Sequence, residues 1–198
     1  MARSASLSRA TRETRVEVRL DLDGNGQSDI RTGLGFLDHM LDQIARHGLI
    51  DLNITATGDL EVDGHHTVED VGILMGQALR AALGERRGIT RFGWALVPLD
   101  EALSQVAVDL SNRGGLVWQV KLPTEKIGDF DTELFKEWFE AFAGNGGVTL
   151  HVTSLAGSNS HHMIESCFKA LALALRQAVS LDPRRAGEVP STKGTLSV

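Results

Sequence analysis

The chain has 198 residues, of which 42% are hydrophobic, and a formal net charge of −6 at pH 7. This length and apolar content suffice to bury a full core in one domain, and they exclude the disordered classes of protein. The negative charge and the lack of a long basic run argue against nucleic acid or an anionic membrane as the main partner. A small anionic substrate remains compatible with this composition, because local Arg and Lys side chains decide its binding.

The single cysteine and the apolar runs indicate the compartment. Cys167 has no possible partner within the chain, and its place on an apolar helix face favours a buried structural thiol over a catalytic one. No apolar run in the sequence is as long as a membrane span, and residues 1–10 contain no apolar signal core. We therefore expect a cytoplasmic protein with no membrane partner.

The first half of the chain is predicted to contain two strands, a helix, a strand and a helix. Apolar and polar residues alternate over 15–22, which is typical of a half-buried strand. The turn at 23–26 could return the chain over 28–32 as the second strand of a hairpin. The other predicted elements are a helix over 36–47, a strand over 50–57, a loop over 58–64 and a helix reaching about residue 83.

The second half repeats this order, with an extra strand near Leu116. Its predicted elements are strands over 91–99, 104–110 and 115–122, a helix over 131–143, a strand over 148–154 and a helix over 162–179. The sequence thus predicts an α+β fold of two pseudo-symmetric β-β-α-β-α halves, about 10–88 and 89–181, within one domain spanning 1–198. Residues 182–198 are rich in Pro, Gly and charge, and we expect a tail that is mobile until it binds something.

A doubled motif is the most informative feature of the sequence. Residues 64–70 read Gly-His-His-Thr-Val-Glu-Asp, and residues 160–166 read Ser-His-His-Met-Ile-Glu-Ser. Ala-Leu-Arg at 78–80 recurs at 174–176 with the same spacing, so the repeat is a structural unit. One copy alone could be an ordinary polar helix start, but two copies in register favour a shared chemical role.

The spacing within each copy predicts a pair of metal sites. A His and a Glu four residues apart lie on one face of a helix and can bind one divalent ion, while the neighbouring His points elsewhere. Nitrogen and carboxylate ligands suit Mn, Fe, Co, Ni or Zn better than Ca or Mg. The predicted ligand sets are His65, Glu69 and His162 for one ion, and His161, Glu165 and His66 for the other.

An alignment of the two halves suggests one further ligand for each ion. When residues 52–55 are placed opposite 150–153, His39 lies opposite Glu137 on the equivalent helix. Both side chains can bind metal, and we predict that they complete the two shells. A solvated helix carboxylate remains the alternative for Glu137.

Other polar residues are candidates for binding and catalysis. Gln43 and His47 follow His39 at four-residue intervals, so all three can share a helix face that looks into the metal site. Glu13 could be a general acid or base, although a solvated carboxylate is the default for its position, and Asp100 with Glu101 ranks lower.

Four residues in Gly-adjacent segments could bind a phosphate. They are Arg91, Arg113, Ser191 and Lys193. Arg offers a planar fork of donors and Lys a point charge, which together suit a phosphate group. Each taken alone is an ordinary surface residue.

The same residues carry a family resemblance. Phe-Leu-Asp-His-Met-Leu at 36–41, the two His-His motifs, Ser-Asn-Arg-Gly at 111–114 and Ser-Thr-Lys-Gly at 191–194 resemble the imidazoleglycerol-phosphate dehydratases of histidine biosynthesis. The resemblance covers residues 12–194. It implies helices packed against four-stranded sheets in the ribosomal protein S5 domain 2-like class. It also implies two Mn ions per active site and a homo-oligomer of about 24 subunits whose sites form between chains.

The resemblance also assigns roles to individual residues. The implied metal ligands are His39, His65, His66, Glu69, His161, His162 and Glu165. The implied phosphate-binding residues are Arg91, Arg113, Ser191 and Lys193, and Glu13, Gln43 and His47 line the pocket, with Gln43 binding substrate and Glu13 and His47 as catalytic candidates. The chain departs from the family at Glu137, where several members have His.

The implied reaction is the Mn-dependent dehydration of D-erythro-imidazoleglycerol phosphate to imidazole-acetol phosphate and water. Two ions on the ring nitrogens would favour a metal-bound imidazolate, and a general acid or base, Glu13 or a metal-bound water, would move the protons. A two-metal hydrolase of a phosphorylated small molecule is the alternative enzyme, because paired ions with these ligands also activate water. A metal-stapled assembly without turnover is the alternative that is not an enzyme. The tail at 182–198 is predicted to bind substrate.

Overall fold

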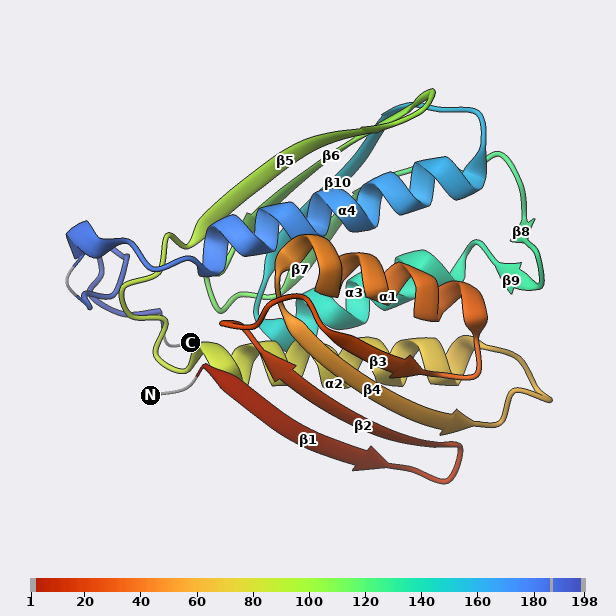
Figure 1. Cartoon of the computed structure of the whole chain (residues 1–198), viewed down its shortest axis with the longest axis horizontal. Coiled ribbons are helices and arrows are strands. Elements are labelled where there is room, and N and C mark those ends of the chain that lie inside the picture. The colour runs from red at the N-terminus through yellow and green to blue at the C-terminus, as the bar shows by residue number, and fades with distance from the viewer. Residues whose placement is uncertain (1–2, 186, 197–198) are drawn as a thin grey trace.

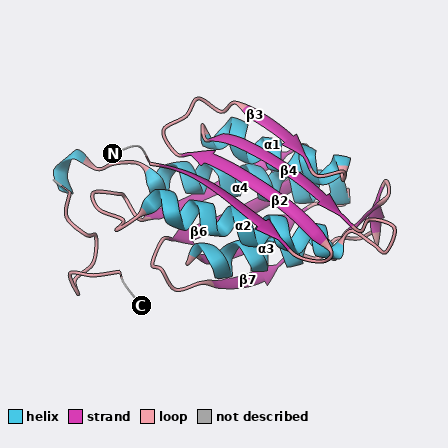
Figure 2. Ribbon diagram, turned by 90° about the horizontal axis from the view of Figure 1, so that it is seen from below, coloured by secondary structure: helices cyan, strands magenta, loops and turns pink. Residues whose placement is uncertain are grey.

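Two sheets enclose two layers of helices. In the computed structural model, which describes residues 3–185 and 187–196, each half of the chain forms one sheet and packs two helices on its inner face (Figure 1). The helix layers meet in the middle, where α1 packs on α4 and α2 packs on α3. Figure 2 shows β3, β4 and β2 of the first sheet lying side by side, with the helices behind them. The predicted α+β class is confirmed.

The two halves have the same order of elements except for a two-stranded ribbon, β8 and β9, that precedes the first helix of the second half. The first half consists of β1 (Ser4–Ala10), β2 (Thr14–Asp21), β3 (Ser28–Arg31), α1 (Gly35–Gly48), β4 (Asp51–Gly58) and α2 (His65–Leu83). The second half consists of β5 (Phe92–Leu99), β6 (Ala102–Asp109), β7 (Gly115–Gln119), β8 (Lys126–Ile127), β9 (Phe130–Asp131), α3 (Leu134–Gly146), β10 (Thr149–Ala156) and α4 (Ser160–Val179). A short 3-10 helix, Pro183–Arg185, begins the tail.

Strand pairing makes the repeat visible residue by residue. The sheet orders are β1-β2-β4-β3 and β5-β6-β10-β7, which are equivalent. Ile54 pairs with Val18 and Ile30 in the first sheet, and Val152 pairs with Val106 and Trp118 in the second. The predicted alignment of 52–55 with 150–153 is therefore confirmed. The strand predicted near Leu116 is present as β7, but it is not extra, because it is the counterpart of β3.

The predicted hairpin over 15–32 is wrong. β2 is antiparallel to β1 on one side and to β4 on the other, so neither edge is left for β3, which instead pairs parallel to β4. The turn serves a different purpose, because the Asp51 carboxylate accepts the backbone N–H groups of Asn25 and Gln27 at 2.8 and 2.9 Å. That contact fastens the loop to the start of β4.

Several predicted boundaries also shift. The helix expected over 131–143 begins at Leu134, because residues 130–131 pair with 126–127 in a small two-stranded ribbon. The strand expected over 115–122 ends at Gln119, and the last helix starts at Ser160 rather than at 162. The strand β1 was not predicted at all.

The largest fully buried side chains of the core lie on α3 and α4. Trp138 stacks on Phe142 with the ring centroids 5.1 Å apart, and both also lie within a cluster that contains Phe168 of α4. Gly72 and Gly76 let α2 approach α3 closely. A Cβ at Gly76 would lie 2.6 Å from the carbonyl oxygen of Phe142, and a Cβ at Gly72 would lie 2.9 Å from that of Trp138. This packing holds the beginnings of the four helices at one end of the molecule, where the His-His motifs lie (Figure 1).

Candidate metal centre and phosphate site

Residues from both halves meet in one potential metal-binding group. Nε2 of His39 on α1 lies 3.3 Å from Oε2 of Glu165 on α4, and Nε2 of His161 lies 3.0 Å from the same oxygen. The three ligand atoms lie within 4.8 Å of one another. Two nitrogens and one carboxylate at this spacing fit a divalent transition ion, as the donor types predict. Among residues 3–185 and 187–196, these form the one group of three such side chains.

The start of α4 is fixed by its own cap. The Asn159 side chain accepts the backbone N–H groups of His161 and His162, which satisfies donors that a helix start leaves unpaired. The Glu101 carboxylate accepts the N–H groups of Ser158 and Asn159, so the loop before the helix is held from the β5–β6 turn. The position of the His161 ring is thus set by backbone contacts.

Lys169 is a functional candidate that the sequence analysis missed. Its Nζ lies 2.7 Å from Oε1 of Glu165, one helical turn later. Burial works to raise the pKa of Glu165, but the hydrogen bond and charge of Lys169 outweigh it, and the pKa is lowered. Glu165 therefore stays ionised and able to bind a cation. The four-residue spacing between Glu165 and Lys169 was the available signal.

His39, Gln43 and His47 share one face of α1, as their four-residue spacing predicts. Nε2 of Gln43 lies 3.4 Å from Nδ1 of His39, and Oε1 of Gln43 lies 3.2 Å from Nε2 of His47. Partial burial, followed by the nearby charge of Lys169, lowers the pKa of His47. The imidazole of His47 is therefore mainly neutral at pH 7, which allows it to accept a proton.

The second His of each motif faces a carboxylate pair. Nδ1 of His66 lies 3.1 Å from Asp59, while its Nε2 is 3.9 Å from Glu13. His162 is arranged in the same way, with Nδ1 2.8 Å from Glu101 and Nε2 3.7 Å from Asp100. A carboxylate on Nδ1 is the usual partner that orients a metal-binding imidazole. Asp59 and Glu101 are thus orienting groups for the two rings.

The remaining predicted ligands are not gathered within the chain. His65 lies beside His66, with the ring centroids 6.2 Å apart, and Glu69 is exposed on α2. Glu137 lies on α3 beside Trp118 in a shallow pocket on the side of β7. Its place is nevertheless equivalent to that of His39, because α3 packs on α2 as α1 packs on α4.

The predicted phosphate residues form a second group. The guanidinium of Arg91 donates to both oxygens of Asp109 at 2.7 and 3.1 Å, and Nη1 donates to the carbonyl of Pro190 in the tail at 2.7 Å. Arg113 lies 4.0 Å from Asp109 and is mostly exposed. The backbone N–H of Lys193 donates to the side chain of Ser191. Arg91 therefore attaches the tail next to Arg113.

Within one chain the two groups are far apart. The Arg91 N–H donates to the carbonyl of Ala178, which follows His161 by 17 residues along α4. At ~1.5 Å per residue, this places the phosphate group about 25 Å from the metal group. Figure 1 shows the tail and the His-bearing helix starts at opposite ends of the molecule. One small substrate cannot contact both groups of the same chain.

Comparisons with known proteins give the family. A profile of the imidazoleglycerol-phosphate dehydratases matches residues 32–175. The chain is 68% identical over 197 residues to the imidazoleglycerol-phosphate dehydratase of Magnetococcus marinus, covering 100% of both chains. It is 60% identical over 194 residues to that of Nitrobacter hamburgensis, covering 98% of both. The chain belongs to the imidazoleglycerol-phosphate dehydratase family.

Solved structures of dehydratases in this family have the same fold. The structure from Staphylococcus aureus is 37% identical with a TM-score of 0.83, covering 90% of this chain and 99% of that one. The structure from Pyrococcus furiosus is 39% identical with a TM-score of 0.82, covering 96% and 99%. The predicted resemblance and the hydro-lyase class are confirmed. No helix among the residues described is long and apolar enough to cross a membrane.

Proposed function

We propose that this chain dehydrates D-erythro-imidazoleglycerol phosphate to imidazole-acetol phosphate and water, as a step of histidine biosynthesis. The observation that carries the proposal is the group of His39, His161 and Glu165, brought together from both halves of a chain that belongs to the dehydratase family. The buried, unpaired Cys167 supports a reducing cytoplasmic location.

The proposed cofactor is a pair of Mn ions per active site. The ligand atoms of His39, His161 and Glu165 fit one such ion. The Nε2 atoms of His66 and His162, whose rings are oriented by Asp59 and Glu101, suit ligands to ions shared with another chain. His65, Glu69 and Glu137 are the proposed ligands of the second set. When bound, the ions supply Lewis acidity that draws electron density from the imidazole ring.

The proposed substrate clamp consists of Arg91, Arg113, Ser191 and Lys193. Arg91 is largely occupied by Asp109 and Pro190, so its first role is to fix the tail and hold one positive charge in place. Arg113 is mostly exposed and free to swing onto an anion. The phosphate would be held by Arg113, Lys193 and the Ser191 hydroxyl, and the rest of the substrate would be oriented by this anchor.

Proton transfer is proposed for Glu13 and His47. Dehydration releases the hydroxyl of the carbon next to the ring as water and removes the C–H proton of the following carbon, leaving an enol whose hydroxyl on that second carbon becomes the ketone. Glu13, exposed and 3.9 Å from His66 Nε2, is placed to take a proton beside this proposed metal ligand. The lowered pKa of His47 keeps its imidazole mainly neutral, so we propose that it accepts a proton from its position beside Gln43.

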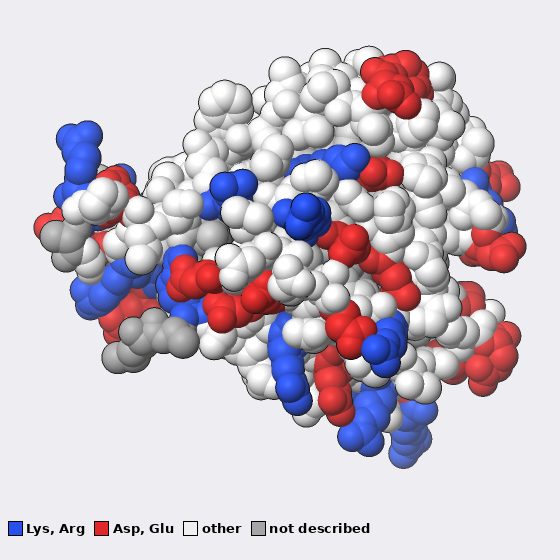
Figure 3. Space-filling view, in the orientation of Figure 1, with Lys and Arg blue, Asp and Glu red and all other residues white. Residues whose placement is uncertain are grey.

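We also propose that the active site forms between chains of a homo-oligomer of about 24 subunits. The ~25 Å between the metal group and the phosphate group of one chain supports this, because a second chain can bring its phosphate group to the first chain's metal group. The outer face of the second sheet supports it too. Trp94, Ala107, His151 and Val117 form one cross-strand row there, and Trp94 is 65% exposed. The region over β5 in Figure 3 carries few charged side chains, which suits a subunit contact.

The test is turnover of imidazoleglycerol phosphate by the metal-stripped protein as Mn is added. The proposal expects the acetol product to appear with Mn, no inorganic phosphate to be released, and a large loss of turnover in His66→Ala. Release of phosphate would favour the two-metal hydrolase instead. Binding of two Mn per chain with no turnover of either kind would favour a purely structural metal role.

A further inference from the structure

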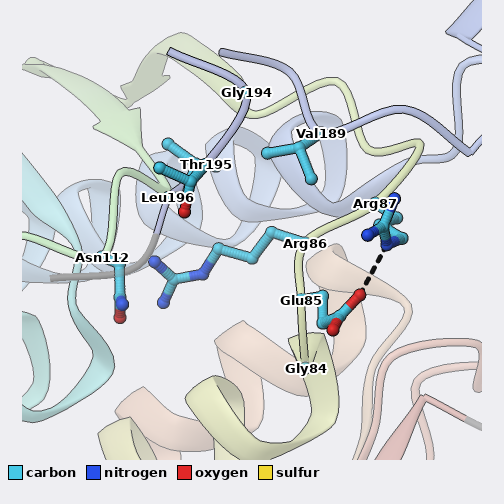
Figure 4. Close-up of a pocket in the computed structure, with 9 residues that line it drawn as sticks. All are labelled: Gly84, Glu85, Arg86, Arg87, Asn112, Val189, Gly194, Thr195 and Leu196. Carbon is cyan, nitrogen blue, oxygen red and sulfur yellow. Dashed lines mark hydrogen bonds and ion pairs between the residues drawn. The ribbon is translucent and has the colours of Figure 1, made fainter.

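A pocket near the tail contains a buried arginine that the proposed reaction does not use. The pocket has a volume of about 340 Å³ and lies between the end of α2, the loop after β6 and the tail. Its lining residues are Gly84, Glu85, Arg86, Arg87, Asn112, Val189, Gly194, Thr195 and Leu196. In Figure 4 the Arg86 side chain extends across the pocket toward Asn112, with Thr195 and Leu196 beside it.

Arg86 forms no salt bridge with a carboxylate among the residues described, although the negative charge of Asp109 acts on it. The residue is 2% exposed, and Nη2 donates to the carbonyl of Gly146 at 2.9 Å. Nη1 is buried without a hydrogen-bond acceptor among the residues described, and no carboxylate among them forms a salt bridge with this guanidinium. The neighbouring Glu85 pairs with Arg87 instead. Burial lowers the pKa of Arg86 to about 10, which leaves it charged at pH 7.

An unpaired acceptor lies on the same pocket wall. Oδ1 of Asn112 is buried and has no hydrogen-bond donor among the residues described. Asn112 also has a φ of 66°, in the left-handed region that Asn adopts more readily than most residues. A buried cation and a buried acceptor without partners are both costly, and a ligand that satisfies both would relieve that cost.

We propose that this pocket binds a small carboxylate that also carries a hydroxyl or ammonium group, with the carboxylate on Arg86 Nη1 and the donor on Asn112 Oδ1. A phosphate dianion fits less well, because it brings two negative charges to a single buried cation. The ligand would also contact the tail at Gly194 and Leu196. The site is distinct from the proposed phosphate clamp, in which Arg91 and Arg113 share Asp109.

The test is calorimetric titration of the Mn-loaded, full-length protein with glycolate, glycine, acetate and inorganic phosphate. We expect one saturable site per chain for glycolate or glycine, and whichever binds identifies the donor as hydroxyl or ammonium. Acetate, which lacks the donor, should bind roughly tenfold more weakly, because one hydrogen bond in a buried site is lost.

Matched variants locate the site. Arg86→Gln should weaken binding roughly tenfold or more, because a charge-assisted hydrogen bond is lost. Arg31→Gln removes the same charge from an exposed position outside the pocket and should change binding less than about twofold. Asn112→Gly keeps the left-handed backbone at low cost and should abolish the preference over acetate even if Arg86→Gln folds poorly. Absence of saturable binding to the unmodified protein would overturn the proposal. So would binding that survives Arg86→Gln but is lost in Arg91→Gln.

Discussion

Glu165 is the residue on which the metal group depends. It is 9% exposed, and it contacts His39, His161 and Lys169 at once. An ionised carboxylate in such a place is stable only if its partners remain cationic or bind a metal. Against the effect of burial, Lys169, together with His161 and His39, lowers the pKa of Glu165 and so keeps this carboxylate ionised with protein partners alone.

Removing that carboxylate charge tests the metal group. Glu165→Gln should lose one tightly bound Mn per chain and lower turnover by roughly a hundredfold or more, because a direct ligand is replaced. Metal analysis after dialysis and initial rates measure the two effects. Glu140→Gln is the control. It removes the same charge from an exposed position on α3, where the nearest cation, Lys136, is 4.0 Å away and the ion pair is weak. A variant that keeps its full Mn content would show that Glu165 is not a ligand.

Cys167 makes stability depend on pH in the alkaline range. Burial raises the pKa of its thiol from 9.0 to about 12. The thiol's contribution is therefore complete below pH 9 and decreases as the pH rises toward 12, because only the unfolded chain ionises. From pH 8 to pH 10, wild type should lose about 1.4 kcal/mol of unfolding free energy relative to Cys167→Ala. Denaturant unfolding at both pH values measures this, and a difference that is constant with pH would contradict the burial of the thiol.

Individual site residues were predictable from the sequence where a repeat or a helical spacing marked them. The offset of the two His-His motifs pointed to His161 and Glu165, and alignment of the halves pointed to His39. The carboxylates that orient His66 and His162 carried no such mark. Asp59 and Glu101 reach those rings from loops, and a loop's path is set by tertiary packing.

At the scale of elements, the alternation of apolar and polar residues predicted where most strands form but not which strands pair in the sheet. β1 reads Ser-Ala-Ser-Leu-Ser-Arg-Ala, and its small, polar residues hide the alternation that its burial nevertheless follows. The hairpin prediction was wrong because turn residues at 23–26 indicate a change of direction and not a partner. Pairing was decided by β1 and β4, which cover both edges of β2.

The close approach of α2 and α3 depends on glycine. A Cβ at Gly76 would lie 2.6 Å from the Phe142 carbonyl oxygen, so Gly76→Ala should destabilise the protein by about 1–3 kcal/mol despite its better helix propensity. Gly144→Ala is the matched control, because no atom lies within 4 Å of that Cβ. It should be neutral or stabilising by up to about 1 kcal/mol. Equal effects at the two sites in denaturant unfolding would contradict this packing.

At the scale of the whole molecule, the length of α4 is the controlling feature. The metal group lies at its start and the phosphate group at its end, about 25 Å apart at ~1.5 Å per residue. Spacing and periodicity did not indicate this separation, and only the family resemblance implied that sites form between chains. The direction of the helix in the fold places the two groups at opposite ends of one chain, and this is why we propose that a neighbouring chain completes the site.

The most direct test of this account mixes two defective chains. Glu165→Gln damages the metal group and Arg91→Gln damages the phosphate group, so each variant alone should be nearly inactive. Chains dissociated, mixed in equal amounts and reassembled should recover roughly a quarter of the wild-type activity, because random assembly pairs an intact metal group with an intact phosphate group in that share of sites. If the mixture is no more active than the separate variants, although mixed oligomers form, the active site is not shared between chains in this way.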